Sequence, residues 1–197
     1  MRLILASSSI YRRQLLARLG LPFETLTPAV DETPVAGEPP AALATRLARA
    51  KARTVAADTT VAGPAVVIGS DQVATLDDIE PLGKPGTFER ARRQLQAASG
   101  RTMRFYTAFA VIAPGTAVIE ETVSIVVRFR QLDDDEIDHY LALEQPFDCA
   151  GAARSEGLGI ALLESIVTDD PTALIGLPLI RVAAALRTVG LDPLGRR

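Results

Sequence analysis

The hydrophobic positions of this chain change their period several times, a pattern typical of strands that alternate with helices. Short apolar runs predict strands at residues 2–6, 23–27, 65–71 and 160–167. Apolar residues spaced three and four apart predict helices at residues 10–20, 40–57, 88–100, 133–144 and 178–189. We therefore expect an α/β fold with a mixed sheet, formed by a single domain over residues 1–197.

A period of two is clearest near the middle of the chain. Val123, Ile125, Val127 and Phe129 alternate with polar residues, which predicts a strand with one buried face. The preceding apolar run, residues 103–113, is joined to this strand through a Pro114-Gly115 turn, so the two runs predict a long hairpin.

Two local expectations bear on the later argument. In the helix at 40–57, we expect an inner stripe of Leu43, Leu47, Ala50 and Thr54. The strand at 65–71 ends on polar residues, with residues 72–76 available to extend it, so we expect these side chains to be presented at a sheet edge.

Composition excludes several classes of protein. Apolar residues make up 48% and charged residues 23% of the 197, which is enough to build a core and excludes general disorder. A net charge of −3 gives no basic surface for stable nucleic-acid binding. The single cysteine excludes an internal disulfide, and no zinc-binding cluster is present. No apolar run approaches the roughly 18 residues of a membrane span, and the apolar start is short for a signal peptide, so we expect a cytoplasmic protein without membrane partners.

The basic residues restrict the chemistry that is available. The one histidine, His139, lies in the acidic segment 133–144, where a solvated helix face is favoured over a catalytic base. Without a usable histidine, a carboxylate would have to act as the general base. Of 21 basic residues only Lys51 and Lys84 are lysines, so these two positions are candidates for sites that reject arginine.

Two kinds of segment could bind a phosphorylated ligand. Residues 7–13 lie at a strand-to-helix junction, where hydroxyls, free N–H groups and the positive helix end favour an anion. The alternative for this segment is an ordinary helix N-cap with surface arginines. Asp31 and Glu32 in a Pro-rich loop, together with Asp71, could share a magnesium ion, whereas the alternative for the loop pair is a solvated turn.

Taken together, these segments resemble the Maf family of nucleoside triphosphate pyrophosphatases over essentially the whole chain. The resemblance rests on ordered motifs, LASSSIYRR (5–13), VDETP (30–34), RLARAKA (46–52), GSDQV (69–73), GKP (83–85), FYTAFAV (105–111) and CAGAARSEGLG (149–159). One departure is Ile10, where the family usually has proline.

The resemblance implies an inosine-triphosphatase-like fold of two lobes, with an elongated mixed sheet and a central nucleotide cleft, often as a homodimer. It also implies hydrolysis between the α and β phosphates with a divalent metal, Mg²⁺ or Mn²⁺. By position, Asp71 resembles the proton acceptor and Glu32 its partner in metal binding. The residues that resemble the phosphate-binding set are Ser7, Ser9, Arg12, Arg13, Lys51 and Lys84.

The residues that differ between subfamilies most resemble the 7-methyl-GTP pyrophosphatases; they are Tyr11, Gln72 and Glu156. Methylation at N7 makes guanine a cation, which an aromatic face attracts, and a carboxylate accepts from the donors of guanine. The alternative for Glu156 alone is a solvated loop residue. Two other functions stay open, a dTTP/UTP pyrophosphatase of the same family and a non-catalytic nucleotide-binding regulator of septum formation.

Overall fold

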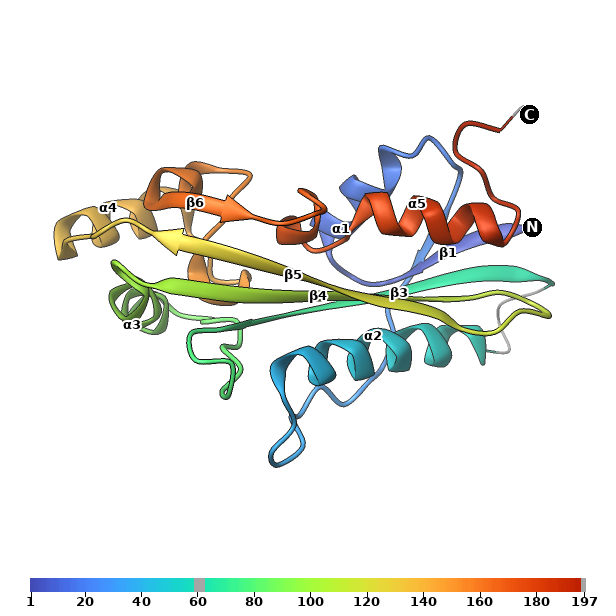
Figure 1. Cartoon of the computed structure of the whole chain (residues 1–197), viewed down its shortest axis with the longest axis horizontal. Helices are drawn as coiled ribbons and strands as arrows, with labels where there is room; N and C mark the ends of the chain where they lie inside the picture. Colours follow the sequence, from blue (N-terminus) through green and yellow to red (C-terminus); the bar gives the residue numbers. More distant parts are fainter. Residues whose placement is uncertain (59–62, 196–197) are drawn as a thin grey trace.

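The computed structural model describes residues 1–58 and 63–195, and in these residues a six-stranded sheet carries helices on both faces (Figure 1). The strands are β1 (Arg2–Ala6), β2 (Glu24–Leu26), β3 (Ala65–Thr75), β4 (Thr102–Ile112), β5 (Ile119–Phe129) and β6 (Leu163–Val167). The α-helices are α1 (Ile10–Ala17), α2 (Pro40–Ala56), α3 (Phe88–Ala98), α4 (Asp134–Glu144) and α5 (Leu179–Thr188). The predicted mixed α/β fold is confirmed.

The strand order is β2-β1-β3-β4-β5-β6. β1 pairs in parallel with β2 and β3, whereas β3 to β6 pair antiparallel. The long strands β3, β4 and β5 each contain 11 residues. They make the sheet elongated, as the family resemblance implies, and β4 and β5 form the hairpin that the sequence pattern predicts.

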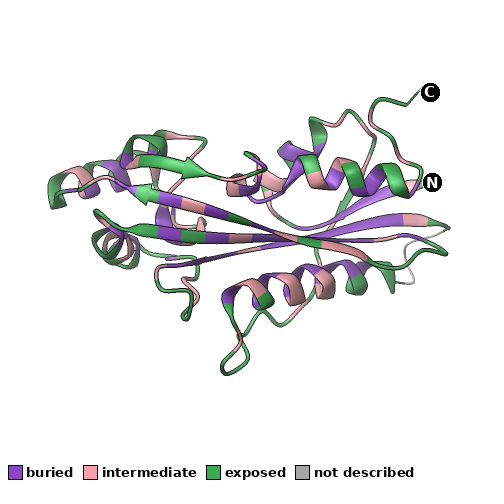
Figure 2. Cartoon of the chain, viewed as in Figure 1, coloured by how far each residue is buried: buried purple, intermediate pink, exposed green. Residues whose placement is uncertain are grey.

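The molecule has two lobes, one at each end of the long strands. On one face of the sheet, α1 and α5 cover a core that includes Leu5, Ile68 and Phe109. At the opposite end, α3, α4 and β6 surround a second core that includes Met103 and Phe129 (left in Figure 1). α2 lies on the other face of the sheet from α1 and α5, against β3 and β4. Buried positions follow the long strands and the helix sides that face them, whereas β6 is mostly exposed (Figure 2).

Side-chain caps fix the starts of two helices, and one local prediction is confirmed. Ser9 caps α1 by accepting from the N–H of Arg12. Asp133 and Glu136 form a capping box at the start of α4, which satisfies two free N–H groups. His139 is exposed on that helix, as the solvated interpretation requires.

Other local predictions are wrong for identifiable reasons. The extension of β3 to Thr75 is the one that the sequence allowed, but the expected position of Asp71 at a sheet edge is wrong. The ladder with β4 runs to Thr75, so Asp71 lies inside a central strand. Thr54 is exposed on α2, since the stripe that contacts the sheet passes through Lys51 and Val55 instead. Residues 160–162 belong to a 3-10 helix (Leu158–Leu162) that precedes β6.

Among the described residues, no helix combines the length and the apolar composition that crossing a membrane requires.

Candidate active site

A lysine and two carboxylates from three separate elements meet at the centre of the sheet. Lys51 of α2 places its Nζ 2.6 Å from Oδ1 of Asp71 in β3 and 2.6 Å from Oε1 of Glu32 in the loop before α2. The side chains of Lys51 and Asp71 are 8% and 9% exposed, whereas that of Glu32 is 60% exposed. The structure thus brings together three of the predicted site residues, which we call the lysine–carboxylate cluster.

Gly69 allows this approach between α2 and β3. A Cβ atom at Gly69 would lie 2.2 Å from the carbonyl oxygen of Ala48 and 2.5 Å from the backbone nitrogen of Ala52, distances that exclude a side chain. The helix therefore packs directly on the strand, two residues before Asp71. Because Lys51 lies next to Ala52 on the buried side of α2, its ammonium reaches Asp71 without leaving the helix–sheet interface.

The electrostatics of the cluster favour a charged carboxylate at Glu32. Burial raises the pKa of Glu32, but its hydrogen bond to Lys51 and the charges of Lys51, Lys84 and Arg12 outweigh burial, so the pKa is lower than its ordinary value. A nearly buried ammonium is stable here because two anions face it. The cluster thus combines a buried carboxylate at Asp71 with an accessible one at Glu32.

The predicted anion-binding segment enters the same region from the start of α1. The Oγ of Ser7 accepts from the N–H of Ser9, and the Oγ of Ser9 accepts from the N–H of Arg12. Both hydroxyls accept in these contacts, so their own hydrogens can be donated to a ligand oxygen. Nε of Arg12 donates to the carbonyl of Gly176 at 2.9 Å, which anchors the guanidinium. Burial lowers the pKa of Arg12, although the charges of Asp71 and Glu32 act in the opposite direction.

The structure does not bring Arg13 to this cluster. Arg13 is exposed and lines an open depression of about 1030 Å³ between α1 and residues 20–25, and neither Asp71 nor Lys51 lines that depression. Its contact with phosphate stays a prediction. Lys84 is also exposed, in the turn after β3, and its charge acts on Glu32 without a direct ion pair among the described residues.

Tyr11, one of the predicted specificity residues, already has a cation on its ring. The Cζ of Arg154 lies 5.4 Å from the ring centroid, within the range of a cation–π contact. Tyr11 belongs to α1 in one lobe, whereas Arg154 lies in the Gly-rich segment that follows α4 in the other. A planar, delocalised cation is therefore compatible with this ring, and the contact connects the two lobes.

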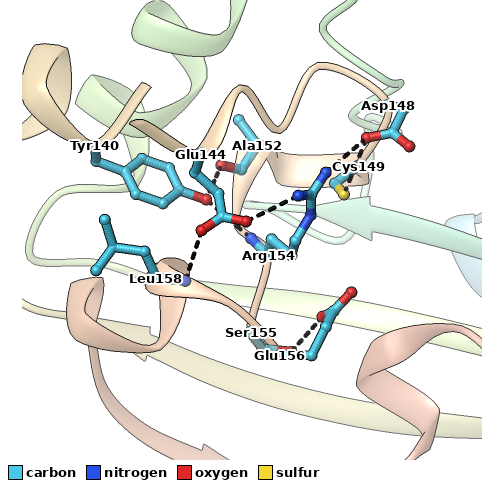
Figure 3. A network of polar contacts seen from close by, with 9 residues as sticks. All are labelled: Tyr140, Glu144, Asp148, Cys149, Ala152, Arg154, Ser155, Glu156 and Leu158. Atoms are coloured by element: carbon cyan, nitrogen blue, oxygen red, sulfur yellow. Dashed lines mark hydrogen bonds and ion pairs between the residues drawn. The ribbon is translucent and has the colours of Figure 1, made fainter. Parts of the chain in front are cut away.

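Arg154 is held by a network on its own side of the molecule (Figure 3). Its Nη1 lies 2.8 Å from Oε1 of Glu144, and its Nη2 lies 3.4 Å from Oδ1 of Asp148. The hydroxyl of Tyr140 accepts from the backbone N–H of Arg154 and donates to the carbonyl of Ala152. The segment that carries Arg154 is thereby fixed to α4.

Glu156 lies two residues beyond Arg154 and is exposed. Its Oε2 lies 3.4 Å from the Oγ of Ser155, and no other described residue bonds to its side chain (Figure 3). A Cβ atom at position 157 would lie 2.6 Å from a carboxylate oxygen of Glu144, so a larger residue there would have to displace the end of that side chain. The carboxylate of Glu156 is therefore accessible to a ligand, and its contact with a base stays a prediction.

Gln72, the third predicted specificity residue, points into a ring of protein acceptors. Its Nε2 lies 2.9 Å from Oγ1 of Thr107 and 3.0 and 2.9 Å from the carbonyls of Ala173 and Leu174. These contacts connect β3 with β4 and with residues 172–177, which lie just before α5. The nitrogen end of Gln72 is therefore used within the protein.

Sequence reasoning missed several residues that support the site. Ser70 donates to the carbonyls of Ala108 and Gly176, Thr107 donates to that of Ala173, and Arg154 covers Tyr11. The Asp-Pro-Thr sequence at 170–172, with its turn-forming residues, was the available indication of an ordered segment before α5. The other contacts join residues far apart in the sequence and leave no local pattern.

The donor set of the cluster fits a hard divalent cation. Glu32 and Asp71 supply carboxylate oxygens, and magnesium commonly takes one or two carboxylates and completes its shell with water and substrate phosphates. Among the described residues there is no group of three or more Asp, Glu, His or Cys that could hold a metal by itself. A cation here would complete its shell with water and with substrate oxygens.

Comparison with known proteins identifies relatives over nearly the full chain. A model of the Maf-like protein family matches residues 2–189. The 7-methyl-GTP pyrophosphatase of Bordetella pertussis is 59% identical over 195 residues, covering 98% of this chain and 94% of the relative. The protein of the same name from Polaromonas sp. is 57% identical over 190 residues, covering 96% and 85%. Among solved structures, the nucleoside-triphosphatase / dITP/XTP pyrophosphatase from Mycobacterium abscessus is 17% identical with a TM-score of 0.48, covering 97% of this chain and 96% of that one.

Proposed function

The chain belongs to the Maf family, and on that premise we propose that it is a nucleoside triphosphate pyrophosphatase acting on 7-methyl-GTP. In the proposed reaction, water attacks phosphorus, the bond between the α and β phosphates breaks, and the products are the monophosphate and pyrophosphate. The observation that carries the proposal is the lysine–carboxylate cluster, a buried base and cation at the point where three elements meet. The names of the relatives support the choice of substrate.

Asp71 is the proton acceptor in this proposal. Attack on phosphorus requires a water that loses a proton. The one histidine, His139, is exposed on α4 and does not belong to the lysine–carboxylate cluster, so a carboxylate has to accept the proton. The Asp71 carboxylate has a fixed direction because it belongs to a central strand and is held by Lys51 at 2.6 Å. A fixed base does not need to reorganise when the proton moves.

The phosphate chain binds between the start of α1 and the cluster. Ser7 and Ser9 donate their hydroxyl hydrogens to phosphate oxygens, and the Arg12 guanidinium neutralises charge while Gly176 holds it in place. Lys84 lies exposed in the turn after β3, where its charge acts on Glu32, and in this proposal it contacts the phosphate chain as well. Phosphoryl transfer depends mainly on such positioning and charge neutralisation.

A divalent cation, Mg²⁺ or Mn²⁺, completes the proposal as cofactor, held by Glu32 and Asp71. When bound, it would supply further positive charge for the phosphate oxygens. The half-exposed position of Glu32 leaves this carboxylate able to turn from Lys51 toward a bound ligand.

In this proposal, the nucleobase of the substrate binds next to Tyr11, Gln72 and Glu156. An aromatic ring that already accepts the guanidinium of Arg154 is chemically suited to a methylated purine, which is also planar and cationic. The exposed Glu156 carboxylate accepts from the N1–H and N2–H₂ groups of guanine.

We also propose the setting in which the enzyme acts. Residues 1–197 form one catalytic domain that acts on free nucleotide in the cytoplasm, without a membrane or a stable nucleic-acid partner, as a homodimer. These proposals rest on the net charge of −3 and on the family resemblance.

Release of pyrophosphate from a panel of triphosphates tests the function. The purified chain is incubated with 7-methyl-GTP, GTP, dTTP and UTP, with Mg²⁺, with Mn²⁺ and with EDTA. We expect the highest kcat/KM for 7-methyl-GTP and loss of turnover with EDTA. Preference for dTTP or UTP would overturn the substrate, and binding without turnover on all four would favour a regulatory binding protein.

A further inference from the structure

Asp170 is a fully buried carboxylate outside the lysine–carboxylate cluster, at the start of the segment that leads into α5. Its Oδ1 accepts from the N–H of Thr172 at 3.2 Å and from the hydroxyl of Thr172 at 2.8 Å. Its Oδ2 accepts from the N–H groups of Ile180 and Arg181 at 2.8 and 3.3 Å. One carboxylate thus ties the turn after β6 to the first turn of α5, whose positive end favours the negative charge.

The 172–177 segment between these two points presents carbonyl oxygens to the candidate site. Gly176 accepts from Nε of Arg12 at 2.9 Å and from Oγ of Ser70 at 3.0 Å. Ala173 and Leu174 accept from Nε2 of Gln72. The segment that Asp170 holds is therefore in contact with a proposed phosphate-binding residue and with a proposed base-selecting residue.

The contacts also determine which end of Gln72 lies inside the protein. The two carbonyls can only accept, and the Thr107 hydroxyl gives its hydrogen to Ala173 at 2.8 Å, so it must accept from Gln72. Three acceptors thus share the two hydrogens of the Gln72 amide nitrogen. No described residue donates to its Oε1, so a ligand meets Gln72 as an acceptor alone.

We infer that Asp170 is a positioning residue for base selection, because it fixes the carbonyls that turn Gln72 into an obligate acceptor. This inference rests on the proposed function. Guanine offers N1–H and N2–H₂ donors, which an acceptor matches, whereas uracil and thymine place one donor between two acceptors and require donors from the protein. When the 172–177 segment is held, the amide hydrogens of Gln72 are not available to a pyrimidine.

The test is a double-mutant cycle that separates positioning from stability. The variants are Asp170→Asn, Gln72→Met and their combination, and the quantity is kcat/KM for 7-methyl-GTP, GTP, UTP and dTTP. The amide introduced by Asp170→Asn would direct an N–H group at the N–H donors that the carboxylate accepts from, so the segment would loosen. The control is Asp77→Asn. Asp77 accepts from a threonine hydroxyl and from two backbone N–H groups, against three for Asp170, and it lies in an exposed turn with no hydrogen bond to Gln72.

We expect Asp170→Asn to lower the purine-to-pyrimidine ratio of kcat/KM about tenfold, mainly through KM, the size of effect that one mispaired hydrogen bond produces. Gln72→Met lowers the ratio to a similar extent, and the combination lowers it no further. The control leaves the ratio within about twofold. A uniform loss on all four substrates, or an effect of Asp170→Asn that persists fully without Gln72, would make Asp170 merely structural and overturn the inference.

Two arrangements keep the outcome decisive. If Asp170→Asn does not fold, as judged by circular dichroism, Thr172→Val replaces it in the same cycle, because the Thr172 hydroxyl contacts Asp170, Leu177 and Leu179. If the wild type hydrolyses none of the substrates, the proposed function fails, and the same ratio is then measured as Kd for 7-methyl-GMP, GMP, UMP and dTMP. Unchanged Kd ratios in the variants would overturn the inference separately.

Discussion

The lysine–carboxylate cluster and the residues proposed to recognise the nucleobase are built in different ways. We call the second group, Tyr11, Gln72 and Glu156, the base side. Lys51 and Asp71 are buried on a long helix and a central strand, and they contact each other directly. Tyr11 and Glu156 belong to different lobes, and Glu156 is exposed in a Gly-rich segment. On the proposed roles of these residues, the chemical step would use a preorganised group, whereas selection of the nucleobase would depend on how well peripheral segments are held.

Removing the proposed base is expected to have the largest effect on activity. Asp71→Asn keeps the size of the side chain and its place in β3, but an amide cannot take a proton from water. We expect kcat to fall about 10²–10⁴-fold, the usual contribution of a positioned base. Steady-state kinetics of pyrophosphate release measure the effect, and near-normal turnover in a folded variant would remove Asp71 from the mechanism.

The two lysines sharpen the comparison because only one of them is buried. We expect Lys51→Arg to lower kcat/KM about 10–10²-fold, since the wider guanidinium does not fit between Asp71 and α2. Lys84→Arg is also expected to lower activity, but less, because that side chain is exposed. Lys51→Met, which leaves the buried Asp71 carboxylate unpaired, should also lower stability by about 3–5 kcal/mol in a denaturant titration. Equal activity of both arginine variants and the wild type would mean that neither position requires lysine.

Tyr11 tests whether the base side recognises a cationic ring. Tyr11→Ala is expected to weaken transition-state binding of 7-methyl-GTP by about 1–3 kcal/mol, the contribution of a base–aromatic stack. The loss should be smaller for GTP, because guanine without the methyl group carries no ring charge. Tyr11→Phe is the matched control, since it keeps the ring that Arg154 covers. An equal loss on all four triphosphates would show that Tyr11 does not distinguish bases.

Glu156 is expected to contribute less than Tyr11, because its side chain is exposed and competes with water. Glu156→Gln offers one acceptor and one donor group where guanine presents donors, so we expect about a tenfold loss in kcat/KM for 7-methyl-GTP. Glu164→Gln, at an exposed carboxylate of β6 that pairs with Arg128, serves as control. If both variants behave alike, Glu156 is an ordinary surface residue.

The reactivity of Cys149 reports how tightly the 149–159 segment is packed, and it can be measured without an activity assay. Burial and the charge of Asp148 raise the pKa of its thiol to about 11, although Arg154 acts in the opposite direction. The thiol is therefore protonated at neutral pH. Because its pKa is higher in the folded chain than in the unfolded chain, the protonated thiol contributes stability that is present below pH 9 and is lost as the pH rises through 11. We expect alkylation at pH 8 to be about 10²-fold slower than for a free cysteine, with a rise toward pH 11. Rapid alkylation at pH 8 would mean that the 149–159 segment is open.

Sequence periodicity was sufficient for the fold wherever one face of an element is buried. The alternation from Val123 to Phe129 predicts β5 correctly, and the scarcity of lysine directs attention to Lys51. The same reasoning failed at Thr54, because the stripe that packs on the sheet includes a charged residue that no apolar period contains. It also missed the contacts of Gln72 with Ala173 and Leu174, since these join residues about a hundred positions apart through backbone atoms.

The three long strands have a consequence for how the molecule moves. β3, β4 and β5 each run for 11 residues, and each supplies side chains to the cores of both lobes. The hydrogen bonds of these ladders run between strands, perpendicular to their length, so the sheet can twist or bend along the strands without losing them. A movement of one lobe relative to the other would therefore pass through the sheet itself and change its twist, since the three strands run uninterrupted from one core to the other. In the described part of the chain no linker separates the two cores, so closure on a nucleotide would be distributed along the strands and shared with the loops that leave the sheet.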